Sequence, residues 1–208
     1  MASRSPRLSR PTVARLCDVA VVLPGVFSVS RPAPGDAAAP ISMLTVRWLS
    51  AANDPLPELH VARVTDLRAD RYRVRVGDVL VPSRSTSIRV AVAPPEIDGT
   101  VFNSTLLAVR CSEQIHPELL AAYLMHPAGA AHLVSASQSG TAQMNLTTAA
   151  LGEVPVPLVP IEQQQELAAL LATADVAHRN ATEAAELRRR VAHDVVISRM
   201  TGRNNVHA

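Results

Sequence analysis

The stretch LGEVPVPLVPIEQQQ, residues 151–165, joins two elements of different kinds. Prolines alternate with apolar residues from Val154 to Leu158, and a proline lacks the backbone N–H that a central strand must donate. This short segment therefore predicts a strand at the edge of a sheet. Pro160 and Glu162 then predict the start of a helix, because proline suits the first turn and the helix dipole favours an acidic side chain there.

The helix that begins here is the longest element that the sequence predicts. Residues 161–201 contain no Gly or Pro, and Gly202 follows them. At 1.5 Å per residue such a helix spans about 60 Å, too long to be covered by one small domain. Its three-four apolar spacing predicts a face that pairs with a second helix; the alternative is a helix that only caps its own domain. The predicted pairing face consists of Leu167, Leu170, Ala174, Ala177, Ala181, Ala184, Leu187 and Val191.

The sequence before residue 151 is β-rich. Tyr72, Val74 and Val76 alternate with arginines, which predicts a half-buried strand over residues 71–76. Gly77-Asp78 predicts a turn. Further strands are expected at 43–49, 79–81, 88–93 and 101–109, a strand or short helix at 16–27, helices at 117–125 and 127–134, and a polar loop at 135–145. The expected fold class is α+β, with a β-rich domain over residues 1–158, one long coiled-coil-type helix over 159–202 and a disordered tail over 203–208.

Composition excludes several enzyme classes. All 20 basic residues are arginine, so the lysine-containing Walker loop and the common nuclease core are ruled out. Neither a Gly-x-Ser-x-Gly elbow nor the cofactor and target-base motifs of an amino-methyltransferase occur. The remaining enzyme hypothesis is small-molecule chemistry at Ser139, His126 or Asp78. No metal site is expected, because His126 and His132 lack a third ligand at suitable spacing.

The location of the protein is inferred from three features. Arg4, Arg7 and Arg10 precede an apolar run, as in a signal peptide, but Asp18 and Pro24 interrupt that run. No apolar stretch approaches the length of about 20 residues that crosses a bilayer. The two cysteines, at positions 17 and 111, have no metal or redox spacing and are expected to be buried free thiols. We therefore expect a soluble cytoplasmic protein.

Candidate DNA-binding residues carry donors that suit phosphates and base edges. They are Arg71, Arg73 and Arg75 on the predicted strand, Arg84 and Arg89 beside the hydroxyl-rich loop 83–87, and Ser139, Thr141, Gln143 and Asn145 in the polar loop. Two alternatives stay open, a solvated strand face for the first group and an ordinary surface loop for the last. The net charge of +2 does not by itself indicate nucleic acid.

Several motifs in one order resemble the specificity subunits of type I restriction-modification systems. The strongest are SGTAQMNL at 139–146 and LGEVPVPLVPIEQQ at 151–164. Weaker ones are LCDV at 16–19, GDVLV at 77–81 and PELLAAYL at 117–124. The family's chains usually carry two recognition domains and two helices, whereas this chain has one of each.

This resemblance implies a non-catalytic subunit whose target-recognition domain docks in the major groove of double-stranded DNA and whose helix spaces two such domains. It implies a methyltransferase partner that holds S-adenosylmethionine, no cofactor in this chain and, in systems that restrict DNA in defence against phage, a motor-nuclease subunit. Pairing of two copies through antiparallel helices would give an inverted-repeat target. The alternative hypothesis is a protein-interaction adaptor that acts through its helix and binds no DNA.

Overall fold

The computed structural model describes residues 11–26, 41–50, 60–62, 69–137 and 144–202. The α-helices are α1 (Leu16–Val19), α2 (Val46–Ser50), α3 (Pro117–Met125), α4 (Pro127–Ala136), α5 (Thr148–Gly152) and α6 (Ile161–Thr201). The strands are β1 (Thr12–Arg15), β2 (Ala20–Pro24), β3 (Ile41–Leu44), β4 (His60–Ala62), β5 (Val79–Pro82), β6 (Arg84–Ser85), β7 (Ala91–Val92), β8 (Val101–Phe102), β9 (Leu106–Cys111), β10 (Met144–Asn145) and β11 (Pro155–Leu158). The chain forms two compact units, Met1–Gln165 and Glu166–Ala208, whose boundary lies within α6.

An antiparallel sheet with strand order β2-β9-β5-β7 is the centre of the first unit. Successive side chains of β5 point to opposite faces of this sheet. Val79 and Val81 pack in the core that includes α3 and α4, while Leu80 packs in the core that includes α2. Both faces are therefore covered, which explains why all four residues of β5 are buried.

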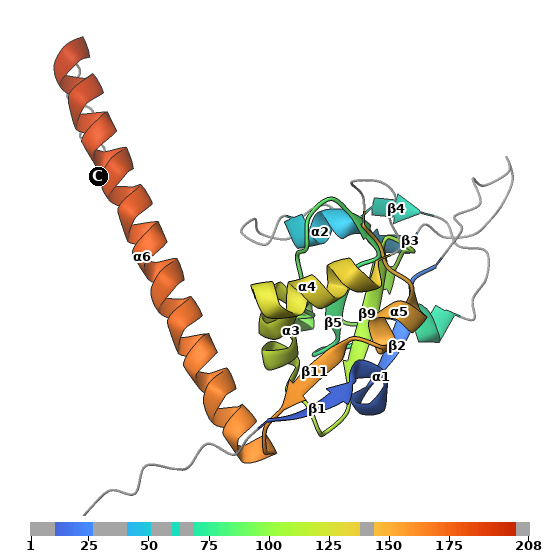
Figure 1. Ribbon diagram of the computed structural model, residues 1–208. Helices are drawn as coiled ribbons and strands as arrows, with labels where there is room; N and C mark the ends of the chain where they lie inside the picture. Colours follow the sequence, from blue (N-terminus) through green and yellow to red (C-terminus); the bar gives the residue numbers. More distant parts are fainter. Residues whose placement is uncertain (1–10, 27–40, 51–59, 63–68, 138–143, 203–208) are drawn as a thin grey trace, which may run out of the picture. The chain divides into compact units, whose positions relative to one another are not determined.

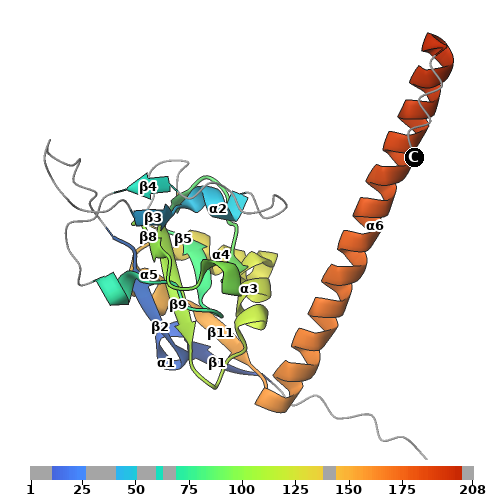
Figure 2. The same ribbon diagram turned by 180° about the vertical axis from the view of Figure 1, so that it is seen from behind.

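Three smaller sheets surround this centre. Strand β3 pairs antiparallel with β4 and parallel with β8. Strand β1 pairs with β11, which confirms the proline-containing segment as an edge strand among the described residues. Strand β6 pairs with β10. In both views, α2, β3 and β4 lie together at one end of the domain and α1, β1 and β11 at the other (Figures 1 and 2).

Helices α3 and α4 begin at Pro117 and Pro127, as predicted, and meet at an angle of 78°. The two helices approach so closely at Gly129 that a Cβ atom there would lie 2.1 Å from the carbonyl oxygen of Tyr123. Leu124 and Leu133 are fully buried against the sheet. No single helix in the described part of the chain is long and apolar enough to cross a membrane.

Several details differ from the sequence-based expectations. The predicted strand at 71–76 is wrong: a 3-10 helix covers Ala69–Tyr72, and only an isolated bridge follows. Val76 is 55% exposed although Val74 is fully buried, so the segment has no continuous apolar face. The expected strand at 43–49 ends at Leu44 and continues as α2, and β7 covers only two residues of 88–93. Cys17, expected to be buried, is exposed; Cys111 is partly buried, and both thiols are free.

Asp78 explains why residues 71–76 do not continue as a strand. Its carboxylate accepts the backbone N–H of Arg75 at 2.9 Å, and its own N–H donates to the Arg75 carbonyl at 2.9 Å. These bonds close a tight turn through Gly77, whose φ of 85° is a conformation that suits glycine. The predicted Gly77-Asp78 turn is thus confirmed, and it ends the extended segment earlier than the alternation of residues suggested.

Candidate nucleic-acid interface

Two segments that the sequence analysis named as DNA-binding candidates meet on one strand pair. Strands β6 and β10 run antiparallel, with Asn145 opposite Arg84 and Met144 opposite Ser85. Cross-strand partners in an antiparallel pair project from the same face, with Cβ atoms roughly 5 Å apart. The pairing therefore brings together a basic side chain and an amide side chain from distant parts of the chain.

Backbone and hydroxyl bonds fix this strand pair to the domain. The carbonyl of the buried Ser83 accepts the Leu146 N–H at 2.8 Å, while the Ser83 hydroxyl donates to the Ser104 carbonyl at 2.6 Å. At the other side, the Asn145 N–H donates to the Ser137 hydroxyl at the end of α4 at 2.9 Å. The β6–β10 pair is thus held to the turn before β9 and to the end of α4, while the side chains of Arg84 and Asn145 are exposed.

Arg84, Arg89 and Asn145 are all exposed. Neither the Arg84 nor the Arg89 side chain has a hydrogen-bond or ion-pair partner within the part of the chain that the structure describes. Their guanidinium groups are therefore open to an external anion. The other candidates of the polar loop, Ser139, Thr141 and Gln143, lie outside the described residues.

The arginines at 71, 73 and 75 do not form the expected row. Arg71 stacks over the ring of Tyr72, 4.6 Å from its centroid, and also hydrogen-bonds to the Tyr72 hydroxyl. Arg73 donates to the Gly99 carbonyl at 2.7 Å. Arg75 is exposed. Among the described residues, no hydrogen bond, strand pairing or pocket joins this group to Arg84 and Asn145.

A partly buried ion pair lies beside the Gly77-Asp78 turn. Arg110 on β9 binds both carboxylate oxygens of Asp78, from Nε at 2.9 Å and from Nη2 at 2.8 Å. Asp78 is only 2% exposed, so this pairing compensates a charge removed from water. Burial and the nearby Asp78 charge raise the pKa of Cys111 to about 12, which keeps that thiol protonated. The Asp78 carboxylate is thus engaged in structural bonds, which argues against a catalytic role.

Sequence reasoning missed a pocket of about 300 Å³ beside the β6–β10 pair. Among the described residues, seven line it: Ser85, Thr86, Ser87, Ile88, Val134, Ser137 and Met144. The hydroxyl run at 83–87 was the available signal, but nothing local to the sequence indicates that α4 and β10 complete the lining. In the described ranges, no group of three His, Cys, Asp or Glu side chains could hold a metal ion.

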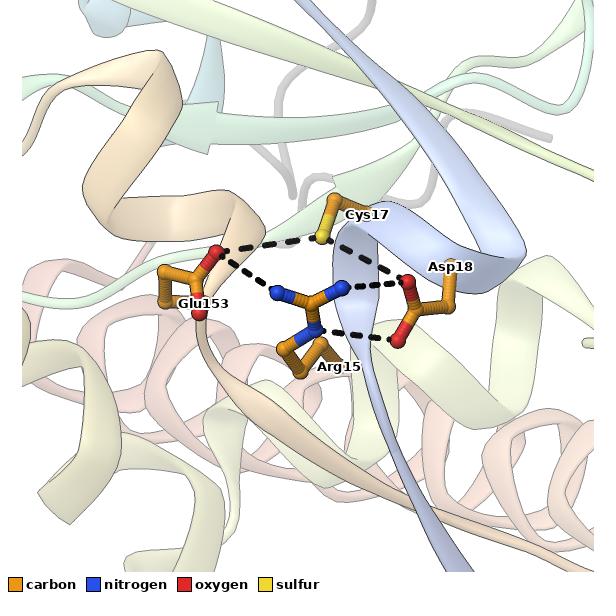
Figure 3. Close-up of polar contacts among 4 residues, drawn as sticks. All are labelled: Arg15, Cys17, Asp18 and Glu153. Atoms are coloured by element: carbon orange, nitrogen blue, oxygen red, sulfur yellow. Dashed lines mark hydrogen bonds and ion pairs between the residues drawn. The ribbon is translucent and has the colours of Figure 1, made fainter.

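The LCDV motif at 16–19 and the start of the motif at 151–164 meet near the place where β1 pairs with β11. The Arg15 guanidinium donates to both carboxylate oxygens of Asp18, at 3.1 and 2.9 Å, and approaches Glu153 at 3.5 Å (Figure 3). The Cys17 thiol lies 3.9 Å from Asp18 Oδ1 and 4.0 Å from Glu153 Oε1. The Leu16 N–H donates to the Val154 carbonyl at 2.9 Å, so the segments 16–19 and 151–154 form one seam.

Electrostatics within this seam favour the charged forms of its side chains. The side-chain hydrogen bond from Arg15 lowers the pKa of Asp18, and the same bond raises the pKa of Arg15. Both side chains are roughly half exposed, so solvent screens the pair. The seam therefore aligns the first and last strands of the domain and does not assemble a reactive centre.

Gln164 in the first turn of α6 is a further residue whose role the sequence did not reveal. It is 2% exposed, and its side chain bonds to residues of the first unit. Its Oε1 accepts the His116 N–H at 2.8 Å, while Nε2 donates to the carbonyls of Gln114 at 2.9 Å and Val159 at 2.8 Å. One amide thus satisfies three backbone groups around the point where the helix starts.

Comparisons with known proteins identify the fold. No protein-family model matches the chain, and no curated protein matches it either. Among solved structures, the HsdS subunit from Thermoanaerobacter tengcongensis aligns over 84% of this chain with 20% identity and a TM-score of 0.56. A chain from a structural study of the assembly and conformational transition of the type I restriction-modification system aligns over 90%, with 20% identity and a TM-score of 0.58. The type I S subunit from M. genitalium aligns over 95%, with 11% identity and a TM-score of 0.54.

The chain therefore has the fold of a type I S subunit, and the expected α+β class with a long C-terminal helix is confirmed. It spans less than half of each solved S subunit: 39%, 44% and 47% of their lengths. The resemblance noted in the sequence is thus confirmed at the level of fold, for one α+β domain followed by one long helix.

Proposed function

We propose that this chain is a DNA-sequence specificity subunit of a type I-like restriction-modification system. The observation that carries the proposal is the pairing of Arg84 with Asn145 on a recognition-domain fold. Arginine suits phosphates and guanine edges, and asparagine suits the adenine edge. One exposed face thus combines a group that can position DNA with a group that can read it.

In this proposal the chain binds and its partners catalyse. Contacts to phosphates would set the position of the domain on the duplex, and side chains from β6, β10 and their loops would read base edges. A partner methyltransferase, which holds S-adenosylmethionine, would supply the methyl transfer. A motor-nuclease partner would be needed for restriction.

The exposed face of α6 supports pairing with a second copy. Leu170, Leu187 and Val191 are 65%, 56% and 53% exposed, and they are apolar side chains that a second helix could cover. The same face carries four alanines, at positions 174, 177, 181 and 184, whose small side chains allow two helices to approach closely. An antiparallel dimer would cover this face and place two recognition domains on an inverted-repeat target.

The charges along α6 favour the antiparallel arrangement. Residues 161–181 contain three acidic residues and one arginine, a net charge of −2. Residues 182–201 contain three acidic residues and four arginines, a net charge of +1. Antiparallel copies would place the acidic half of one helix beside the basic half of the other, whereas parallel copies would place like charges together.

The test is selection of randomised duplex DNA with this chain in complex with its partner methyltransferase, at near-physiological salt. The proposal predicts enrichment of a short motif, bipartite or with inverted-repeat symmetry. A folded complex that enriches no sequence would overturn the proposal and favour the adaptor hypothesis, in which the helix recruits a partner and the β-rich domain binds no DNA.

A further inference from the structure

The pocket beside the β6–β10 pair has a lining of mixed character. Its apolar part is made by Ile88, Val134 and Met144, and its polar part by the hydroxyls of residues 85–87 and Ser137. Val134 is 61% exposed, so its side chain is accessible to a group that enters the pocket. None of the seven lining residues carries a charge. This lining does not suit a phosphate or a carboxylate, and it does suit a neutral group that combines an apolar part with a hydrogen-bonding atom.

Two of the hydroxyls have a defined direction of hydrogen bonding. Ser85 Oγ accepts the Ser87 N–H at 3.1 Å, and Ser137 Oγ accepts the Asn145 N–H at 2.9 Å. A hydroxyl has one donor besides its acceptor lone pairs, and no bond donated by either hydroxyl occurs among the described residues. Each can therefore donate its proton to an acceptor that enters the pocket.

The surroundings of the pocket point to DNA as the source of this group. Arg84 and Arg89, both exposed, flank the hydroxyl loop on either side, and Asn145 follows Met144 on β10. A duplex held at its phosphates by these arginines would present base edges to the pocket between them.

Among the four bases, only thymine presents a methyl group in the major groove, beside the O4 acceptor. We propose that this pocket receives the edge of one thymine, with the C5-methyl against Val134 and Met144 and O4 accepting from a serine hydroxyl. This inference rests on the proposed function and assigns one base of the target to one set of side chains.

The test removes single methyl groups from the DNA. The motif selected by the intact complex is resynthesised with each thymine replaced in turn by deoxyuridine, which differs only by the C5-methyl. Because burying one methyl group contributes about 0.8 kcal/mol, one position should lose affinity about fourfold and the others little. In the Val134→Ala complex the difference between thymine and deoxyuridine at that position should shrink toward onefold.

Val21→Ala is the matched control, since Val21 on β2 is 60% exposed but lies outside the pocket. It should leave the deoxyuridine profile unchanged. Sequence-specific binding that is insensitive to every deoxyuridine, a selected motif without thymine, or a sensitive position unaffected by Val134→Ala would each overturn the pocket assignment while leaving the proposed function intact. Absence of any sequence preference would instead overturn the proposed function itself, and the thymine assignment with it.

Discussion

Asn145 lies directly opposite Arg84 on the antiparallel pair formed by β6 and β10. The two residues belong to segments that are distant in the sequence, and the backbone bond from Leu146 to Ser83 fixes their register. The finding joins two separate sets of candidate DNA contacts into one exposed face. Arg71, Arg73 and Arg75 are not part of this strand pair and lie in the segment before the Gly77-Asp78 turn.

Substitution of the two partners should have different effects on DNA binding. Asn145→Ala should reduce discrimination at one base pair by about 1–3 kcal/mol, because a bidentate contact to a base edge is lost. Arg84→Ala, if Arg84 binds a phosphate, should weaken binding to all sequences and lower the salt slope by about one. Binding titrations at several salt concentrations measure both effects. Arg179→Ala on α6 is the control, and an equal loss for all three variants would contradict the assignment.

Gly129→Ala should destabilise the domain, although alanine is the better helix former by about 1 kcal/mol. The added Cβ would lie 2.1 Å from the Tyr123 carbonyl oxygen, so α4 must shift away from α3. We expect a loss of about 2 kcal/mol in the free energy of unfolding, measured by urea denaturation. An increase in stability would show that the two helices are not in the close contact described.

Gln164→Ala should reduce stability by about 2 kcal/mol, because three backbone groups around the start of α6 lose their partner. The neighbouring Gln165 is exposed, so Gln165→Ala is a matched control and should change stability by less than about 0.5 kcal/mol. Urea denaturation of the two variants side by side makes the comparison. Equal effects would mean that the buried amide has no special role.

The Arg15–Asp18 pair should make a contribution to stability that depends on pH. The side-chain hydrogen bond from Arg15 lowers the pKa of Asp18 in the folded chain below its usual value. The contribution is therefore fully present above the unfolded pKa and is lost as pH falls through the lower, folded pKa. Asp18→Asn should be less stable than the wild type at pH 7, and the difference should shrink below pH of about 4. Glu113→Gln, a change at an exposed carboxylate without a described ion pair, is the control and should show no such trend.

Association through α6 can be tested by placing a charge on the predicted pairing face of this helix. Ala181→Glu should convert a dimer to monomers in sedimentation equilibrium, because two glutamates would be buried between the helices. Ala172 lies on the opposite side of the same helix, so Ala172→Glu makes the same chemical change outside the pairing face and should leave the dimer intact. A wild-type chain that remains monomeric with and without DNA would contradict dimerisation.

The elements with strong local signals were predictable from the sequence. Helix α6 has the predicted bounds, α3 and α4 begin at their prolines, and β11 is the expected edge strand. The segment at residues 71–76 was not predictable from its alternation, because the carboxylate of Asp78 bonds to the backbone of Arg75 and closes a turn.

The site was predictable only as separate segments. Arg84 and Asn145 could each be proposed from their chemistry, but their pairing depends on contacts between distant parts of the chain. The pocket could not be predicted from the sequence either, because its lining combines distant segments: Val134 comes from a helix and Ser85 from a strand. The bonds of Gln164 likewise depend on the position of the chain around residues 114–116.

The central claim, that this chain reads DNA sequence, is tested most directly by competition between the selected motif and a scrambled duplex of the same composition. The complex of the chain with its methyltransferase partner should prefer the selected motif by about 10³ or more at physiological salt, and its affinity for both duplexes should fall steeply as salt rises. Equal affinity for the two duplexes would contradict a role in sequence recognition.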